Sequence, residues 1–580
     1  MKKIHYLFLF ALVLTAACQP KDSDLNTLFE QSDFLETDDY EGTVGYAKKL
    51  AKRFKEVNCQ VIGQSGQGRD IVMLIVDEKG LTNPKKIRRQ GKDILLVQSC
   101  IHPGEPHGKD AGFLMVKNML LQGINKDLLK DFSILFVPVV SPDGLANFSP
   151  FNRINQNGPK KMGWRVTAQG LNLNRDYTKL ESPELRAMVN VFNQWQPDLF
   201  IDTHATDGAD YQYVTTYSIE DFGNYDSGIS DWMRQTWEPE IVKAMQGYGM
   251  PVTRYIEFRP WGNPNGILYD ESFSALFSES YACARNCAGL LLETHMLKPY
   301  KERVLSSYNM IVETMKIVRQ HKTEFDQAIK QARVNDTQLQ ELPIRLVANV
   351  KDTLWVDFKG FHFDTLKSEV TGGTYYAYDT TKPETRRTMK FRCDLPQKTL
   401  SVPKAYVIPV QYTQVIDILK AHGFEVETMK KEKTMKVNSY RFKNVKFSPN
   451  PSEGHQKVQQ FEIEEISKEV TYPKGSVTVK TNQNGVRLLM NLLEPEMQGS
   501  LLEWGYFNTI FQRNEYFEVY KMEPMAQQML DADPLLKIQF DEWLKAQHPR
   551  PNQYAILNWF YERSPYFDPT YNLYPIGIIR

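Results

Sequence analysis

The sequence contains little cysteine, no long apolar run and no excess of charge of either sign. Only six of its 580 residues are cysteine, and 70 lysines and arginines balance 70 aspartates and glutamates. Balanced charge leaves no basic surplus for phosphate contacts, which disfavours a nucleic-acid-binding protein. No apolar run reaches roughly 18 residues, which excludes a polytopic membrane protein. The absence of a sustained short-period repeat excludes collagen-like, coiled-coil and solenoid classes.

The remaining composition is that of a globular protein. Apolar residues make up 42 % and charged residues 24 % of the chain, and the aromatic content of 12 % argues against long disordered stretches. The length is compatible with two to four domains. Apart from Cys18, the five cysteines are too few and too widely spaced for a disulfide framework, although one bridge is compatible with them. Without a CxxC pair, no structural zinc site of that type is expected.

The first 18 residues predict export. Lys2 and Lys3 precede a short apolar stretch, residues 4–17, which is typical of a signal peptide rather than a membrane span. The stretch ends in Leu-Thr-Ala-Ala-Cys18, which resembles a bacterial lipobox. We therefore expect a lipoprotein signal peptide over residues 1–18, lipidation of Cys18, and a membrane-anchored protein on the periplasmic or surface face of the cell envelope. An ordinary secreted signal peptide is the alternative.

The next part of the chain predicts an α/β domain. After a polar linker, residues 19–38, apolar runs alternate with helical patterns such as Tyr46–Phe54, which favours a largely buried sheet over residues 39–335. A stretch from Lys301 to Arg333 is expected to be helical and to close the domain. The turn Gly63–Arg69 precedes the strand Ile71–Val76. Four further apolar runs are expected to be strands: Ile94–Ser99, Ile134–Val140, Leu199–Thr203 and Gly289–Leu292.

Beyond about Asn335 the pattern changes to one typical of an α+β region. Several segments alternate apolar with polar residues, as half-exposed strands do. Tyr412–His422, followed by Gly423, and Ile538–Lys545 predict helices. We expect residues 342–580 to form an α+β accessory region packed on the first domain.

Each of the four apolar runs ends in a polar cluster. The clusters begin at His102, Ser141, His204 and Glu293. In open α/β sheets, ligands bind beyond the carboxyl ends of the strands. The four clusters therefore predict one shared crevice.

The residue types in that crevice fit a catalytic metal site. His102 and Glu105 are three positions apart across a Pro-Gly turn, and His204 supplies a third ligand. Two histidines and one carboxylate form a known zinc set that leaves a fourth position for water. Glu293 lies outside this set and is the expected general base. Asp202, two residues before His204 on a strand, can orient its imidazole.

The order of these motifs resembles that of the zinc carboxypeptidases, the carboxypeptidase A-like metallopeptidases. The similarity covers roughly Tyr40 to Met315, and five motifs occur in the family's order. The resemblance implies a three-layer α/β/α domain with a mixed sheet, one zinc ion, and cleavage at the free C-terminus of a peptide by a zinc-activated water. The motifs are His102-Pro-Gly-Glu105, Ser141-Pro-Asp-Gly144, Gly170-Leu-Asn-Leu-Asn-Arg175, the strand of His204, and Leu292-Glu-Thr294.

The resemblance also assigns residues that the pattern alone does not. Asn174 and Arg175 match the pair that binds the substrate's terminal carboxylate. Arg153 is similar to the arginine that stabilises the oxyanion, with Arg165 as the rival. Asn172 stands where many members have an aspartate behind a zinc histidine. For the family's substrate-contacting tyrosine, Tyr269 and Tyr281 both remain open.

These observations predict a lipid-anchored, exported zinc carboxypeptidase acting on peptides. Two alternatives remain: a zinc amidase or endopeptidase acting on cell-wall peptides, and a catalytically inactive peptide-binding lipoprotein. The presence of all three ligands and of the base argues against the inactive alternative.

Overall fold

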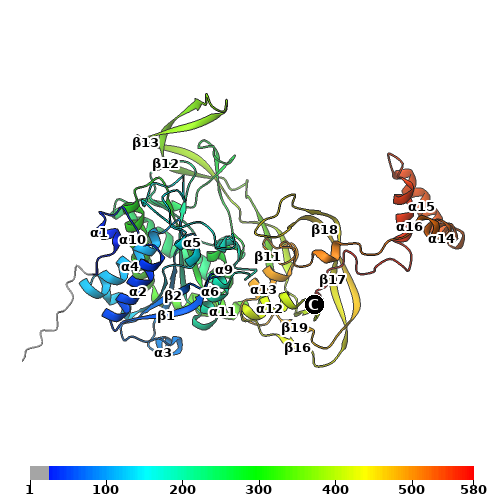
Figure 1. Ribbon diagram of the computed structural model, residues 1–580, viewed down its shortest axis with the longest axis horizontal. Helices are drawn as coiled ribbons and strands as arrows, with labels where there is room; N and C mark the ends of the chain where they lie inside the picture. Colours follow the sequence, from blue (N-terminus) through cyan, green and yellow to red (C-terminus); the bar gives the residue numbers. More distant parts are fainter. Residues whose placement is uncertain (1–24) are drawn as a thin grey trace, which may run out of the picture.

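The computed structural model describes residues 25–580 (Figure 1). The predicted signal peptide and Cys18 lie outside the described residues. No helix within residues 25–580 combines the length and the apolar character needed to cross a bilayer. The five cysteines in this range are all free, so they form no disulfide bridge with one another.

The largest sheet has eight strands and mixed direction, which confirms the predicted α/β class. Parallel pairing joins β4, β3, β5 and β10 in the middle of the sheet, whereas β1 and β2 pair antiparallel at one edge. In spatial order the strands are β1 (Val57–Gln64), β2 (Asp70–Val76), β4 (Phe132–Val137), β3 (Asp93–Gln98), β5 (Leu199–Thr206), β10 (Ala288–His295), β6 (Thr215–Ser218) and β7 (Val252–Arg254).

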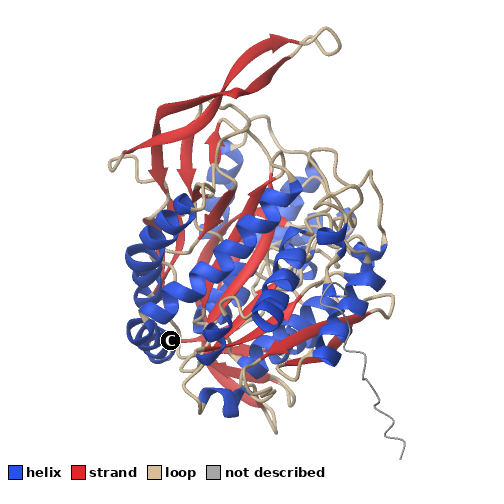
Figure 2. Ribbon diagram, turned by 90° about the vertical axis from the view of Figure 1, so that its left-hand side faces the viewer, coloured by secondary structure: helices blue, strands red, loops and turns tan. Residues whose placement is uncertain are grey.

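The central strands are buried along almost their whole length because helices cover both faces of the sheet (Figure 2). Alternate side chains of β3 pack into two different hydrophobic cores. Ile94 and Leu96 lie in the first core, and Leu95 and Val97 lie in the second. The second core is completed by helices α2 (Tyr40–Arg53), α4 (His107–Lys117), α8 (Glu238–Gly247), α10 (Tyr300–Gln320) and α11 (Lys322–Asp336). The first is completed by α6 (Pro183–Trp195) and α9 (Ser278–Ala284), together with α12 (Thr413–Ala421) and α13 (Val486–Leu493) of the C-terminal region.

The stretch expected to be helical from Lys301 to Arg333 is confirmed, as two helices, because His321 has non-helical backbone angles (φ −112°, ψ 33°) between α10 and α11. The expected linker before the domain needs correction. The described part of the expected linker, residues 25–38, contains helix α1 (Leu28–Gln31), which is capped by Thr27. Phe29 is only 1 % exposed and packs edge-on against Tyr300, so this segment is held on the domain by burial of an aromatic ring.

The C-terminal region builds three further sheets and extends one of them onto the first domain. Strand β13 pairs with β9, so strands from both regions share a four-stranded sheet, and its hairpin β12–β13 projects from the body (Figure 1). The four strands are β12 (Leu354–Lys367), β13 (Thr374–Arg392), β9 (Ile267–Asp270) and β8 (Glu257–Arg259).

The other two sheets lie wholly in the C-terminal region. One pairs β11 (Glu341–Val347) with β14 (Leu395–Ser401). The other contains β16 (Glu427–Thr428), β19 (Val477–Lys480), β15 (Ala405–Ile408), β20 (Gly577–Ile579), β17 (Lys433–Phe447) and β18 (Val458–Tyr472). Helices α14 (Val519–Ala532), α15 (Pro534–Ala546) and α16 (Gln553–Tyr561) form a separate small bundle at the far end of the molecule (Figure 1).

Candidate metal centre and substrate pocket

The functional side chains converge where β3, β5 and β10 end side by side. His102 and Glu105 lie in the loop after β3, His204 lies on β5, and Glu293 is paired directly opposite His204 on β10. The Ser141–Gly144 cluster does not join them, contrary to expectation. Its Asp143 instead accepts hydrogen bonds from Ser65 Oγ and the Gln67 backbone, because the turn before β2 folds over the end of β4.

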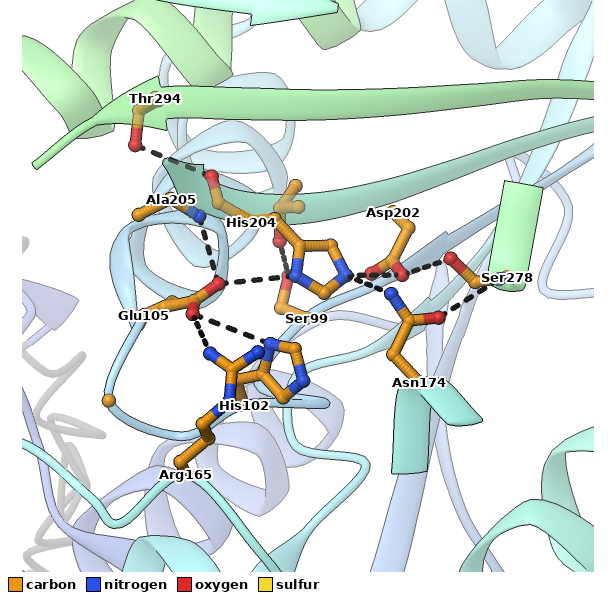
Figure 3. Close-up of polar contacts among 12 residues, drawn as sticks. Ser99, His102, Glu105, Arg165, Asn174, Asp202, His204, Ala205, Ser278 and Thr294 are labelled. Carbon is orange, nitrogen blue, oxygen red and sulfur yellow. Dashed lines mark hydrogen bonds and ion pairs between the residues drawn. The ribbon is translucent and has the colours of Figure 1, made fainter. Parts of the chain in front are cut away.

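Three side chains form a compact group suited to a metal ion (Figure 3). His102, Glu105 and His204 are buried, and one ligand atom from each lies within 4.8 Å of the other two. His102 Nδ1 is 3.4 Å from Glu105 Oε1, and His204 Nδ1 is 3.2 Å from Glu105 Oε2. Ligand atoms on a tetrahedral zinc ion are about 3.4 Å apart, given bonds of about 2.1 Å. The spacing therefore fits zinc with little rearrangement.

The second nitrogen of each histidine is held by a neighbouring side chain. Asn172 Oδ1 lies 2.8 Å from His102 Nε2, and the same oxygen accepts the Asn174 backbone N–H, which identifies it as the acceptor. Asp202 Oδ2 lies 2.8 Å from His204 Nε2. Both acceptors place the proton on Nε2 and leave Nδ1 free to bind a metal. His102 Nδ1 is buried and makes no hydrogen bond within residues 25–580, so this nitrogen is available to bind a metal ion.

The charges around Glu105 keep it ionised. Burial raises the pKa of Glu105, but Arg153 and the two histidines outweigh burial and hold it well below its ordinary value. Burial lowers the pKa of His102 to about 4, so this imidazole is neutral at physiological pH. Burial also lowers the pKa of His204, but Asp202 and Glu105 outweigh it and raise the value well above the usual range. A metal ion therefore competes with a proton for His204.

Both candidate arginines reach the carboxylate of Glu105. An Arg153 side-chain nitrogen lies 2.8 Å from Glu105 Oε1, and Arg165 lies 3.3 Å from the same atom. The Arg153 side chain is 9 % exposed and that of Arg165 is 43 % exposed. Gly104 permits the buried approach, since a Cβ at this position would come within 2.8 Å of the Arg153 side chain.

The metal group lies at one side of a pocket of about 570 Å³. Asn174 and Arg175 line it from the short 3-10 turn Leu173–Arg175, whose first position is capped by Asn172. The Arg175 guanidinium donates to the Asn174 carbonyl and lies 4.3 Å above the Phe277 ring, and it has no carboxylate partner within residues 25–580. A half-buried, unpaired guanidinium is suited to an incoming carboxylate.

Glu293 also lines the pocket, on the strand next to that of His204. Its Oε2 is buried and makes no hydrogen bond within the described part of the chain. Burial raises the pKa of Glu293 to about 8, the carboxylates of Glu105 and Glu279 add to this effect, and His204 opposes it. The side chain is therefore placed to exchange a proton near neutral pH.

Comparison with known proteins agrees with this geometry. Residues 43–236 match the family model for zinc carboxypeptidases. A protein from Trichophyton rubrum named carboxypeptidase 2 is 22 % identical over 484 residues, covering 80 % of this chain and 82 % of its own. Its Trichophyton equinum counterpart is 22 % identical over 427 residues, covering 70 % of this chain and 73 % of its own.

Residues 43–236 therefore carry a match to the zinc carboxypeptidase family.

Solved structures of carboxypeptidases are also matched, at low overall similarity. A metallo-carboxypeptidase from Pseudomonas aeruginosa, in complex with (2-guanidinoethylmercapto)succinic acid, is 18 % identical and has a TM-score of 0.35. It covers 48 % of this chain and 69 % of its own. Carboxypeptidase A from Helicoverpa armigera is 17 % identical with the same TM-score, covering 51 % of this chain and 74 % of its own. The family uses zinc, and the group of His102, Glu105 and His204 is where this chain can hold it.

The tyrosine expected in the zinc carboxypeptidase pocket is neither of the two considered from the sequence. Tyr281 is fully buried and contacts His422, and Tyr269 packs on Phe391. Tyr255 lines the pocket instead, between strands β7 and β8. No local motif marks this residue, so only the folding of the chain around the pocket reveals it.

A second pocket residue that the sequence did not indicate is Glu279, near the start of α9. Its side chain is 1 % exposed and its Oε1 has no hydrogen-bond partner within residues 25–580. Burial raises the pKa of Glu279 to about 7. The pocket is thus lined by three arginines, Arg153, Arg165 and Arg175, and by the carboxyl groups of Glu279 and Glu293.

We expect purified protein to contain about one equivalent of zinc, because three ligands and one water complete a tetrahedral site. His204→Ala should lose most of this zinc, as measured by elemental analysis after dialysis. His321→Ala is the control, since His321 lies outside the pocket, beside Glu240. Full zinc retention by the His204 variant would show that the ligand set is wrong.

Proposed function

We propose that the chain is a metallocarboxypeptidase that removes C-terminal residues from peptides, with zinc held by His102, Glu105 and His204. The observation that carries the proposal is the unpaired Arg175 guanidinium in the same pocket as the metal group. Zinc, when bound, activates a water molecule and polarises the scissile carbonyl. Arg175 and Asn174 bind the terminal carboxylate and so place the last peptide bond beside the metal group.

The other pocket residues act on protons and developing charge. Glu293 accepts the proton of the attacking water and passes it to the leaving amine, a role that its unpartnered Oε2 in the pocket supports. Arg153 is our assignment for stabilising the oxyanion, because its guanidinium is fixed by burial against Glu105. Arg165 is the alternative, since it reaches the same carboxylate from a more exposed position. Tyr255 is placed to contact the substrate.

The rival functions differ in what they require of Arg175. A zinc amidase or endopeptidase acting on cell-wall peptides does not need a free terminal carboxylate in its substrate. The half-buried Arg175 guanidinium has no anionic partner, which favours a substrate that brings a carboxylate to it. A catalytically inactive peptide-binding protein does not need a base, whereas Glu293 lies opposite His204 in the pocket.

We also propose the placement of the protein and the division of its chain. Residues 1–18 are a lipoprotein signal peptide, Cys18 is lipidated, and the protein is anchored in the bacterial cell envelope. Residues 39–335 form the catalytic domain and residues 342–580 an accessory region. The accessory region shares a hydrophobic core with α6 and α9, which supports a role next to the pocket.

Glu293→Gln should lower turnover by a factor of the order of 10² or more while zinc is retained, because the amide keeps the size of the side chain but cannot accept a proton. Steady-state kinetics and zinc analysis measure the two quantities. Glu257→Gln is the control, since Glu257 also lines the pocket but pairs with Arg259. A near wild-type rate in the Glu293 variant would remove this residue from the mechanism.

Amidation of a peptide's C-terminus should abolish its cleavage, and Arg175→Met should cost roughly 2–5 kcal/mol of transition-state stabilisation on free-acid peptides. Mass spectrometry of paired free-acid and amidated peptides measures the first effect, and kcat/KM gives the second. Arg186→Met, at an exposed arginine paired with Asp417, is the control. Equal cleavage of both peptides at internal bonds would instead establish an endopeptidase or amidase.

Cys18→Ser should release the protein from membranes, because the lipid attached to this cysteine is the proposed anchor. Fractionation of cells that express the full chain measures the partition, and Cys59→Ser serves as the control. Undiminished membrane association of the Cys18 variant would overturn the lipid-anchor proposal.

A further inference from the structure

A hairpin turn of the C-terminal region reaches the segment that leads into Asn174 and Arg175. The loop between β17 and β18 ends in a two-residue turn, in which Ser452 and His455 exchange backbone hydrogen bonds of 2.9 and 2.8 Å. The central residues, Glu453 and Gly454, have positive φ values of 49° and 79°. Two-residue hairpin turns of this kind prefer asparagine, aspartate or glycine at the first central position. Glutamate at position 453 is therefore not explained by the turn itself.

The Glu453 side chain instead contacts the segment that serves both the metal group and the substrate subsite. Its Oε2 accepts a hydrogen bond of 2.7 Å from the backbone N–H of Asn172. Asn172 in turn holds His102 Nε2 through its side chain and caps the short turn that presents Asn174 and Arg175. One contact from the C-terminal region thus acts on the residue that links a metal ligand to the carboxylate-binding pair.

The same hairpin turn also contacts Glu181, nine residues after Asn172. His455 Nε2 lies 2.7 Å from Glu181 Oε1, and Tyr506 donates to the same oxygen over 2.8 Å. The His455 ring stacks on Tyr506 with centroids 5.6 Å apart and planes inclined by 22°. The hairpin turn therefore packs against Tyr506 of the C-terminal region and contacts Asn172 and Glu181 of the first domain.

Between these two contacts the segment is fixed by a lysine. Lys179 Nζ donates to the Arg175 carbonyl over 2.8 Å and lies 4.2 Å above the ring of Trp504 in the C-terminal region. Trp504 is 1 % exposed, so it forms a rigid support. The Glu453 charge also opposes the lowering of the Arg175 pKa that burial and Arg165 cause.

We propose that the 452–455 turn is a clamp through which the C-terminal region positions the pocket, with Glu453 as the positioning residue for His102, Asn174 and Arg175. This inference rests on the proposed function for its effect on peptide cleavage, but its effect on zinc binding stands independently. On this proposal, the C-terminal region holds His102 and the pair Asn174 and Arg175 at fixed positions relative to one another.

Two substitutions separate this role from that of a simple turn. Glu453→Asn places a preferred residue in the turn but shortens the side chain, so the contact to Asn172 is lost while the hairpin keeps its geometry. Glu453→Gln keeps both the length and an oxygen that accepts from Asn172. Glu464→Asn is the matched control, since Glu464 lies on the same hairpin, exposed and paired with Lys443.

We expect zinc affinity of the full chain, measured by competition with a chelator, to fall roughly tenfold or more in Glu453→Asn, the scale for losing a group that supports a metal ligand. KM for free-acid peptides should rise and kcat should fall, while the melting temperature is unchanged or higher. Glu453→Gln should recover zinc affinity to near wild type, and Glu464→Asn should change neither quantity.

Zinc affinity and kcat/KM within twofold of wild type in Glu453→Asn would overturn the proposal. A loss that Glu453→Gln does not recover would also overturn it, because the hydrogen bond to Asn172 is the contact proposed. If the wild-type protein bound zinc but cleaved no free-acid peptide, the carboxypeptidase function would fail. The zinc measurements would still decide the role of the clamp.

Discussion

The buried carboxylate of Glu105 is the group on which the site depends. One oxygen faces His102 and both arginines, and the other faces His204 and accepts the backbone N–H of Ala205 over 2.9 Å. A buried charge is tolerated only where it is paired and hydrogen-bonded, so these partners must be present together. The same contacts tie the loop after β3 to the end of β5 and bring the two histidines to one point.

This constraint explains why the protein surrounds the metal group with a second set of polar residues. Asn172 accepts a hydrogen bond from Nε2 of His102, and Asp202 accepts one from Nε2 of His204. Ser278 in turn donates to Asp202 over 2.5 Å. The support continues outward through Asn172 to Glu453 in the C-terminal region. Orientation of a metal ligand is thus passed along hydrogen bonds from one part of the chain to the other.

Sequence reasoning succeeded where the chemistry is local. The apolar runs that became β3, β4, β5 and β10 are buried on both faces, and a continuous apolar run is what such strands require. It was wrong for Asp143, which also follows a strand but folds onto the turn before β2 rather than toward the pocket. A strand end predicts a place on the sheet edge, but the path of the following loop depends on what packs against it.

The sequence by itself determined the fold class and brought His102, Glu105, His204 and Glu293 to notice, because the side chains stand next to buried strands whose pattern is read directly. Only the tertiary structure decided which tyrosine lines the pocket, that Asp143 turns to Ser65 and Gln67, and that Glu453 contacts Asn172. These features join residues as far as 281 positions apart. Such contacts follow from the packing of whole sheets and helices, and no short-range pattern encodes them.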